Sequence, residues 1–60
     1  MTEKQLRQVQ SQLPDGTQIL RLYRAFEGDY RVIAKTPGDN FEKRYTIKFE
    51  NDYPRIQLMP

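Results

Sequence analysis

The chain has 60 residues, with ten Lys and Arg against eight Asp and Glu, a net charge of +2, and neither cysteine nor histidine. A chain this short forms one small domain, near the lower size limit for folding without disulfides or a metal. The missing residue types exclude disulfides, Cys/His zinc sites, a thiolate nucleophile and a Ser-His-Asp triad. We therefore expect a protein that is not an enzyme and that uses no cofactor or metal.

Apolar residues never run for more than three positions, as at 32–34, so no segment is long enough to span a bilayer or to act as a secretory signal. We therefore expect a cytoplasmic protein. Its four Tyr and three Phe, with the Ile and Leu residues, are too many for a disordered chain of this length. Residues 1–60 should fold as a single domain of modest stability, to which dimerisation or a bound partner can contribute.

The first element predicted is a helix over residues 3–13. Thr2 and Gln5 have the spacing of a capping box at its start, and Pro14 is expected to end it. Three apolar residues recur with the period of one helix face and should pack on the core: Leu6, Val9 and Leu13.

Three turn signals, at 27–29, 36–40 and 51–52, divide the rest of the chain into four strands. We place the strands at about 18–26, 30–35, 43–50 and 54–59, in an antiparallel meander whose last strand is an edge strand, because Pro54 lacks a backbone donor. Alternation assigns these side chains to the face that packs against the helix: Leu20, Leu22, Phe26, Tyr30, Val32, Ala34, Tyr45, Ile47, Phe49, Ile56 and Leu58. The predicted fold is α+β, with one N-terminal helix packed on one face of a four-stranded sheet in two layers.

The opposite face of the predicted sheet is rich in positive charge. Six of its ten side chains are basic and none is acidic, because the acidic residues fall in or beside turns or at the start of the helix. Alternation places these residues on that outer face: Arg21, Tyr23, Arg31, Ile33, Lys35, Arg44, Thr46, Lys48, Arg55 and Gln57.

The loop lengths predict how the strands align. A three-residue loop at 27–29 sets Phe26 opposite Tyr30, which places Arg21 opposite Lys35.

A two-residue loop at 51–52 sets Ile47 opposite Ile56 and therefore Lys48 opposite Arg55. Two like-charge pairs would then lie directly across strands, each costing about a few tenths of a kcal/mol. A sheet selected for stability alone would mix the signs of its charges.

An exposed basic sheet with a central aromatic residue is one way in which proteins bind single-stranded nucleic acid. We therefore hypothesise a small regulatory module whose outer face contacts phosphates through its cations and a base through tyrosine, using Arg21, Tyr23, Arg31, Lys35, Arg44, Lys48 and Arg55. Two alternatives stay open. The face can be ordinary solvated surface, or the chain can be a small protein-binding inhibitor or adaptor that acts through a sheet edge or its acidic hairpin tips, with a homodimer through an edge strand as a related arrangement.

Residues that could carry chemistry are few. The carboxylates at 27 and 29, and those at 50 and 52, lie at expected hairpin tips, where acid–base catalysis would lack a cleft. The three glycines are isolated turn residues and form no phosphate-binding loop. Turn geometry explains both features.

Residues 45–54, Tyr-Thr-Ile-Lys-Phe-Glu-Asn-Asp-Tyr-Pro, resemble a strand-and-turn segment of ubiquitin-conjugating enzymes, in which a Phe-Pro-x-x-Tyr-Pro turn follows an alternating strand. Glu50 replaces the first Pro of that pattern, the Pro pair that follows it is absent, and the sequence contains no cysteine for the catalytic position. The resemblance covers ten of the 60 residues. It would imply a non-catalytic half-domain that binds a protein, which belongs with the second alternative.

Overall fold

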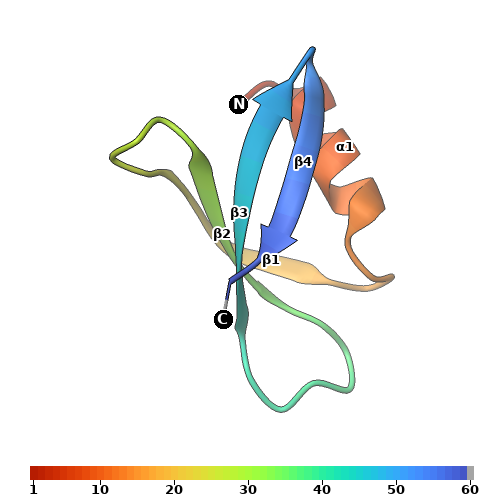
Figure 1. The fold of residues 1–60 in the computed structure, drawn as a ribbon. Coiled ribbons are helices and arrows are strands. Elements are labelled where there is room, and N and C mark those ends of the chain that lie inside the picture. The colour runs from red at the N-terminus through yellow and green to blue at the C-terminus, as the bar shows by residue number, and fades with distance from the viewer. Residues whose placement is uncertain (60) are drawn as a thin grey trace.

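A computed structural model describes residues 1–59 and contains one helix followed by four strands (Figure 1). The elements are α1 (Glu3–Gln12), β1 (Gln18–Arg24), β2 (Tyr30–Lys35), β3 (Lys43–Glu50) and β4 (Tyr53–Leu58). The strands form one antiparallel sheet in the order β1-β2-β3-β4. The predicted α+β fold, a helix followed by an antiparallel meander, is confirmed.

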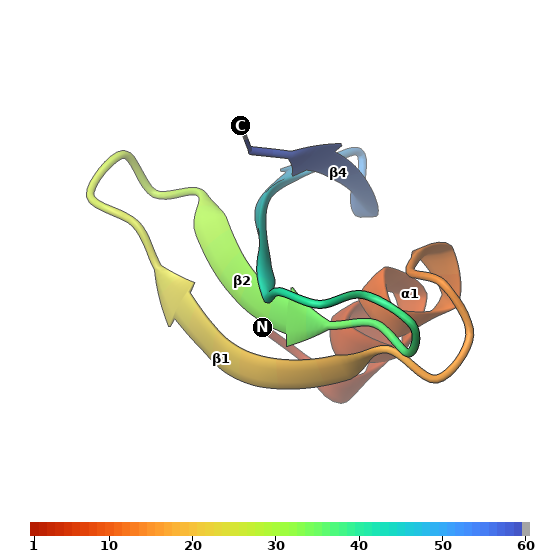
Figure 2. The same cartoon turned by 90° about the horizontal axis from the view of Figure 1, so that it is seen from below.

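The helix α1 lies alongside β4 and covers only part of the sheet (Figure 1). Seen from below, the sheet is strongly twisted, and the loop that joins β1 to β2 extends to the side away from α1 (Figure 2). A ten-residue helix spans about 15 Å at 1.5 Å per residue, which is too short to cover a four-stranded twisted sheet completely. Much of β1 is therefore left uncovered.

The ends of α1 follow from the local sequence. The Gln5 backbone N–H donates to Thr2 Oγ1 at 3.1 Å and the Thr2 backbone N–H donates to Gln5 Oε1 at 2.9 Å, which is the predicted capping box. Leu13, which precedes Pro14, has an extended ψ of 156°, because the proline ring disfavours helical geometry at that position.

No helix within residues 1–59 is long and apolar enough to cross a membrane.

The hydrophobic core is small and lies between α1 and the middle of the sheet. Its buried side chains are Val9, Leu13, Val32, Ala34 and Ile47, and partly buried residues that include Tyr30, Tyr45, Phe49 and Ile56 pack around them. The rings of Tyr30 and Phe49 meet edge to face at 6.0 Å between centroids. The inward assignments on β2 and β3 are therefore confirmed, whereas Leu58, at the end of β4, is exposed.

The prediction for β1 was partly wrong. A register shift between Ile19 and Arg21 interrupts the strand, so Ile19 contacts the core while Leu20 is exposed. A bulge of this kind inserts one residue and moves the preceding side chains to the other face. Strand β1 also ends at Arg24, two residues earlier than predicted, which leaves Phe26 fully exposed in the loop.

The loop between β1 and β2 spans residues 25–29 and is closed by a hydrogen bond from the Ala25 N–H to the Asp29 carbonyl at 2.6 Å. Arg21 therefore lies opposite Ile33 instead of Lys35, and the predicted like-charge pair between Arg21 and Lys35 is wrong. The register differs from the prediction by two residues, and this keeps each outer side chain on its predicted face, because strand side chains alternate with period two.

The hairpin between β3 and β4 agrees with the prediction. Asn51 and Asp52 have φ angles of 52° and 63°, the left-handed geometry that a two-residue hairpin turn requires. Ile47 lies opposite Ile56, and the predicted pairing of Lys48 with Arg55 is confirmed.

Candidate nucleic-acid interface

The sheet face away from α1 carries the ten side chains assigned to it by alternation. Neighbours across the strands form rows on this face, such as Tyr23 opposite Arg31 and Arg31 opposite Thr46. A second row places Ile33 between Arg21 of β1 and Arg44 of β3. The predicted site residues therefore share a face, although they spread across all four strands.

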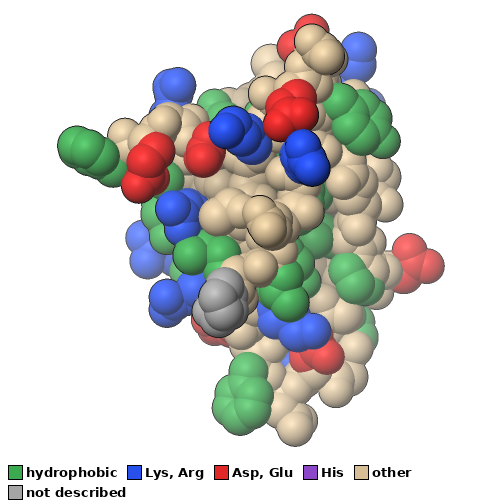
Figure 3. Space-filling view, viewed as in Figure 1, with side chains coloured by type: hydrophobic (Ala, Val, Ile, Leu, Met, Phe, Trp, Pro, Cys, Tyr) green, Lys and Arg blue, Asp and Glu red, His purple; other side chains and the backbone are tan. Residues whose placement is uncertain are grey.

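The expectation that no acidic residue lies on this face was wrong. Glu50 occupies the last position of β3, opposite Tyr53 and on the same side as Lys48, and its carboxylate lies 3.4 Å from Arg55 Nη1. The sequence places Glu50 at the end of the third predicted strand, beside the turn, and the alternation that directs Thr46 and Lys48 outward also directs Glu50 outward. On the face seen in Figure 3, Lys and Arg side chains are interspersed with Asp and Glu near the upper ends of the strands.

Several cations on the outer face are already engaged. Arg31 forms an ion pair with Glu27 at 3.6 Å, and its Nη1 lies 3.1 Å from the Met59 sulfur. The Lys35 ammonium donates to the backbone carbonyl of Asp39. These contacts direct part of the positive charge toward the protein's own acceptors.

Two cations of the outer face differ from the others. Among the residues that the structure describes, neither Arg44 nor Lys48 takes part in an ion pair, a side-chain hydrogen bond or a cation–π contact, and both are exposed. Arg44 lies opposite Ile33 and Lys48 lies opposite Arg55. They are the outer-face charges that a polyanion could reach without displacing an internal contact.

The aromatic residue of the candidate interface is Tyr23, which lies on the edge strand β1 opposite Arg31 and not at the centre that the sequence predicted. Its side chain is 45% exposed, and the Arg21 guanidinium lies 5.7 Å from the centre of its ring. A guanidinium at this distance is attracted to the face of the ring in a cation–π contact. The pair presents a planar aromatic group beside a positive charge, the combination that stacks on a base and contacts its phosphate.

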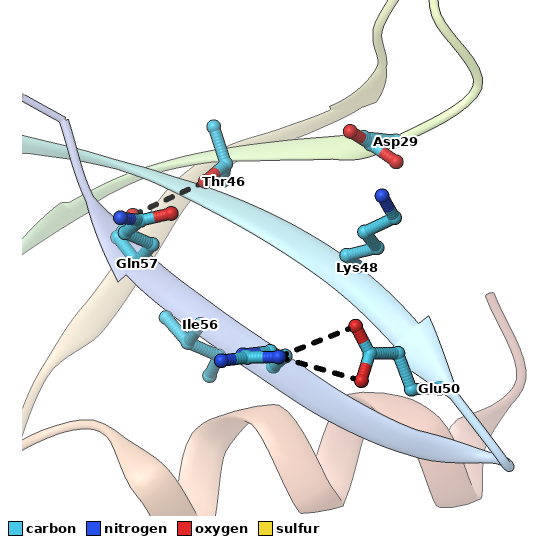
Figure 4. A pocket seen from close by; sticks show the side chains of 7 residues that line it. Asp29, Thr46, Lys48, Glu50, Ile56 and Gln57 are labelled. Carbon is cyan, nitrogen blue, oxygen red and sulfur yellow. Dashed lines mark hydrogen bonds and ion pairs between the residues drawn. The ribbon is translucent and has the colours of Figure 1, made fainter.

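A shallow hollow of about 520 Å³ lies over β3 and β4 on the same face (Figure 4). Thr46 and Gln57 form one part of its lining, and the Thr46 hydroxyl donates to the backbone carbonyl of Gln57 at 3.4 Å. Lys48 extends from the other part toward the carboxylate of Asp29 (Figure 4).

The hollow has mixed polarity. Lys48 and Arg55 can donate to an anionic oxygen, and Gln57 can form hydrogen bonds with a polar edge such as that of a base. Asp29 and Glu50 lie in the same lining and oppose a phosphate placed directly against them. The hollow suits a polar group that offers both donors and acceptors better than it suits a phosphate alone.

The described residues form no candidate metal site. Within residues 1–59, no three carboxylates gather into a group that could hold a metal ion. The pKa of Lys43 is raised by its hydrogen bond to Asp39 and by the charge of that carboxylate, whose Oδ2 lies 3.0 Å from Lys43 Nζ. This pair joins the β2–β3 loop to the start of β3 and lies away from the hollow.

Comparison with known proteins gives no match: no protein family, no curated protein and no solved structure is significantly similar to this chain. The segment 45–54, with its local resemblance to ubiquitin-conjugating enzymes, forms most of β3, the following turn and the start of β4. Function therefore has to be argued from the geometry.

Proposed function

We propose that this protein is a small, non-enzymatic regulatory module of the cytoplasm that binds nucleic acid through the outer face of its sheet. The observation that carries the proposal is the shared orientation of six cations and Tyr23 on the side of the sheet that α1 leaves open. Because the strands hold these side chains in one surface, phosphates could be contacted without folding of the chain.

Single-stranded nucleic acid fits this surface better than a duplex does. Tyr23 can stack on a base only if the base is unpaired. The side-chain amide of Gln57, in the hollow, can form hydrogen bonds with another unpaired base. Arg44 and Lys48 would contact phosphates, since they have no internal ion pair within residues 1–59.

The test is a titration of labelled single-stranded and duplex oligonucleotides, at about 50 mM salt and then at about 200 mM salt, where the phosphate contacts are more strongly screened. The logarithm of the affinity should fall linearly with the logarithm of the salt concentration, because bound cations release counterions from the nucleic acid. The double substitution Arg44→Glu with Lys48→Glu should weaken binding and lower the salt slope by about two, one for each lost contact.

The control is the double substitution Lys4→Glu with Arg7→Glu on α1, which changes the net charge by the same amount at exposed positions. It should reduce affinity only through the overall field and leave the salt slope unchanged. Equal loss in both double variants would show that net charge, and not the outer face, governs binding. At low salt, even non-specific nucleic-acid binding proteins have dissociation constants well below about 100 µM. Absence of binding to either oligonucleotide at about 100 µM protein would therefore overturn the proposal.

The second candidate function is a small protein-binding inhibitor or adaptor. It is supported by the exposed apolar residues of β1, because an edge strand of this kind can receive an added strand. A protein partner bound there would leave Arg44 and Lys48 free, so reversing their charges would not affect it. The charge-reversal variant therefore separates the two candidates once a ligand is in hand.

A further inference from the structure

The two edges of the sheet differ in how accessible their backbone is. On the β4 edge, Pro54 has no N–H, the Gln12 side-chain amide donates to the Pro54 carbonyl at 3.0 Å, and α1 lies alongside the strand. The β1 edge carries no such cover within residues 1–59 (Figure 2). An edge of this kind can pair with another strand.

The register identifies the backbone groups of β1 that are available. Ala25 donates to the Asp29 carbonyl, so Ala25 and Asp29 form a hydrogen-bonded pair. Antiparallel pairs alternate between the hydrogen-bonded and non-hydrogen-bonded types, so the pairs that involve Leu22 and Arg24 are non-hydrogen-bonded. The N–H and C=O groups of Leu22 and Arg24 therefore point away from β2, toward the open edge.

The side chains along this edge are unusually apolar for a surface. Leu20 is 43% exposed, Leu22 36%, and Phe26 in the adjoining loop 104%. The arginines at 21 and 24 are the only charged residues of β1. The bulge between Ile19 and Arg21 limits regular pairing to the part of the strand that follows it.

We propose that a second copy of this chain pairs with β1, antiparallel and about a two-fold axis at Tyr23. In this register Leu22 of each copy exchanges hydrogen bonds with Arg24 of the other, so that all the outward backbone groups identified above are used. Tyr23 then lies opposite its own counterpart, and Arg21 lies opposite Ala25 of the other copy. The pairing begins beyond the bulge and needs no rearrangement of β1.

Charge and the bulge together select this register over its two neighbours. With the axis at Leu22, Arg24 would have to pair with Leu20, which lies in the bulge. A shift of the axis to Arg24 would place that arginine opposite itself, and directly opposed like charges destabilise a sheet. With the axis at Tyr23, no arginine faces another arginine, and the exposed side chains of Leu20 and Phe26 lie at the two ends of the paired segment, on the same side as Leu22. Two copies of β1 can therefore pair in this register without opposing like charges, and their apolar side chains come together.

Pairing of this kind joins two sheets into one and keeps both outer faces on the same side. Arg21 and Tyr23 of the two copies then lie near one another at the centre of the joined outer face. The proposal does not depend on nucleic-acid binding, because it rests on the backbone, the charges and the apolar side chains of β1.

The expected association is weak. An aromatic side chain offers about 200 Å² when fully exposed, and the short pairing segment falls well below the total of about 1,600 Å² buried in a standard interface. We therefore expect a monomer at low micromolar concentration and a dimer near the millimolar range.

The chain contains no cysteine, so a disulfide formed by a variant with one introduced cysteine can only join two copies of the chain at that position. The substitution Tyr23→Cys places two thiols at a non-hydrogen-bonded pair across the axis, where Cα atoms lie about 4.5 Å apart and a disulfide can close. The matched control is Tyr53→Cys, an exposed tyrosine on the β4 edge. Under mild oxidation Tyr23→Cys should form the disulfide-linked dimer at least ten times faster than Tyr53→Cys.

Leu22→Cys tests the register. Its thiols would be diagonal to one another across the axis, with Cα atoms more than about 7 Å apart, and should not form a bond. Faster crosslinking of Leu22→Cys than of Tyr23→Cys, or equal rates for Tyr23→Cys and Tyr53→Cys, would overturn the proposed pairing.

A measurement without cysteine completes the test. Sedimentation of the unmodified chain should show the mass of one chain at about 10 µM and approach that of two chains at about 1 mM. Arg24→Pro removes an outward N–H and leaves the β1–β2 hydrogen bonds in place, so it should stay monomeric with little change in melting temperature. An unmodified chain that stays monomeric at about 1 mM would overturn the proposal and leave the β1 edge to a different protein.

Discussion

Replacement of Ile47 by alanine tests the central packing contact of the fold. Ile47 is 0% exposed, lies on β3 opposite Ile56, and belongs to the same cluster as Val9 of α1 and Val32 of β2. Removal of three carbon atoms from such a site loses their burial and leaves a cavity, which costs about 2–5 kcal/mol.

That cost is large for a protein of this size. Natural domains have about 0.05–0.15 kcal/mol of stability per residue, which gives about 3–9 kcal/mol for 60 residues. Each kcal/mol shifts the melting temperature of a 60-residue domain by about 8 °C. Ile47→Ala should therefore lower the melting temperature by at least about 15 °C and could leave the chain unfolded at room temperature.

The control is the same substitution at Ile33, on the outer face of the neighbouring strand between Arg21 and Arg44. Ile33 is partly exposed, so Ile33→Ala should cost about 1 kcal/mol or less, and Ile47→Val provides a milder core change of about 0.5–1.5 kcal/mol. Urea unfolding followed by circular dichroism measures all three variants. A larger loss from Ile33→Ala than from Ile47→Ala would show that the two faces of the sheet are assigned the wrong way round.

Two further predictions concern local contacts. Thr2→Ala should lower the free energy of unfolding by about 1 kcal/mol, because the capping box is lost. Thr2→Ser keeps the capping hydroxyl and should change the free energy of unfolding little, and urea unfolding measures both variants. The Lys43 pKa is raised by Asp39, so the pair stabilises the folded state at neutral pH and this contribution disappears as the pH rises through the raised pKa. Titration of the Lys43 side chain by NMR should show its pKa returning toward the ordinary lysine value in Asp39→Asn, and an unchanged pKa would refute the assigned cause.

Much of the fold could be predicted because its determinants are local. Pro14 ends α1 through a steric effect on the residue before it, and the Thr2 and Gln5 side chains bond only to each other's backbone. Asn51 and Asp52 accept positive φ angles, so a two-residue turn sets the register of β3 and β4 without help from the rest of the molecule.

The sequence predicted which side chains form the candidate interface, but it did not predict how acidic residues balance their positive charge. Alternation placed its ten side chains correctly, since strand geometry fixes which side each residue takes. It did not show that Glu27, Asp39 and Glu50 would approach the cations from neighbouring loops and strand ends. Such contacts depend on how the loops fold back over the sheet, and residue spacing alone does not contain that information.

By itself, the sequence determined the order of helix and strands, the turn at residues 51–52, and the residues that alternate between the two faces. Only the tertiary structure decided the bulge near Leu20 and the early end of β1 at Arg24. The physical reason is that a short helix can bury only the middle of a twisted sheet, so Ile19 packs on the core while Leu20, Leu22 and Phe26 stay exposed. An amphipathic strand pattern indicates which side chains could be buried, but the area that α1 covers decides which of them are.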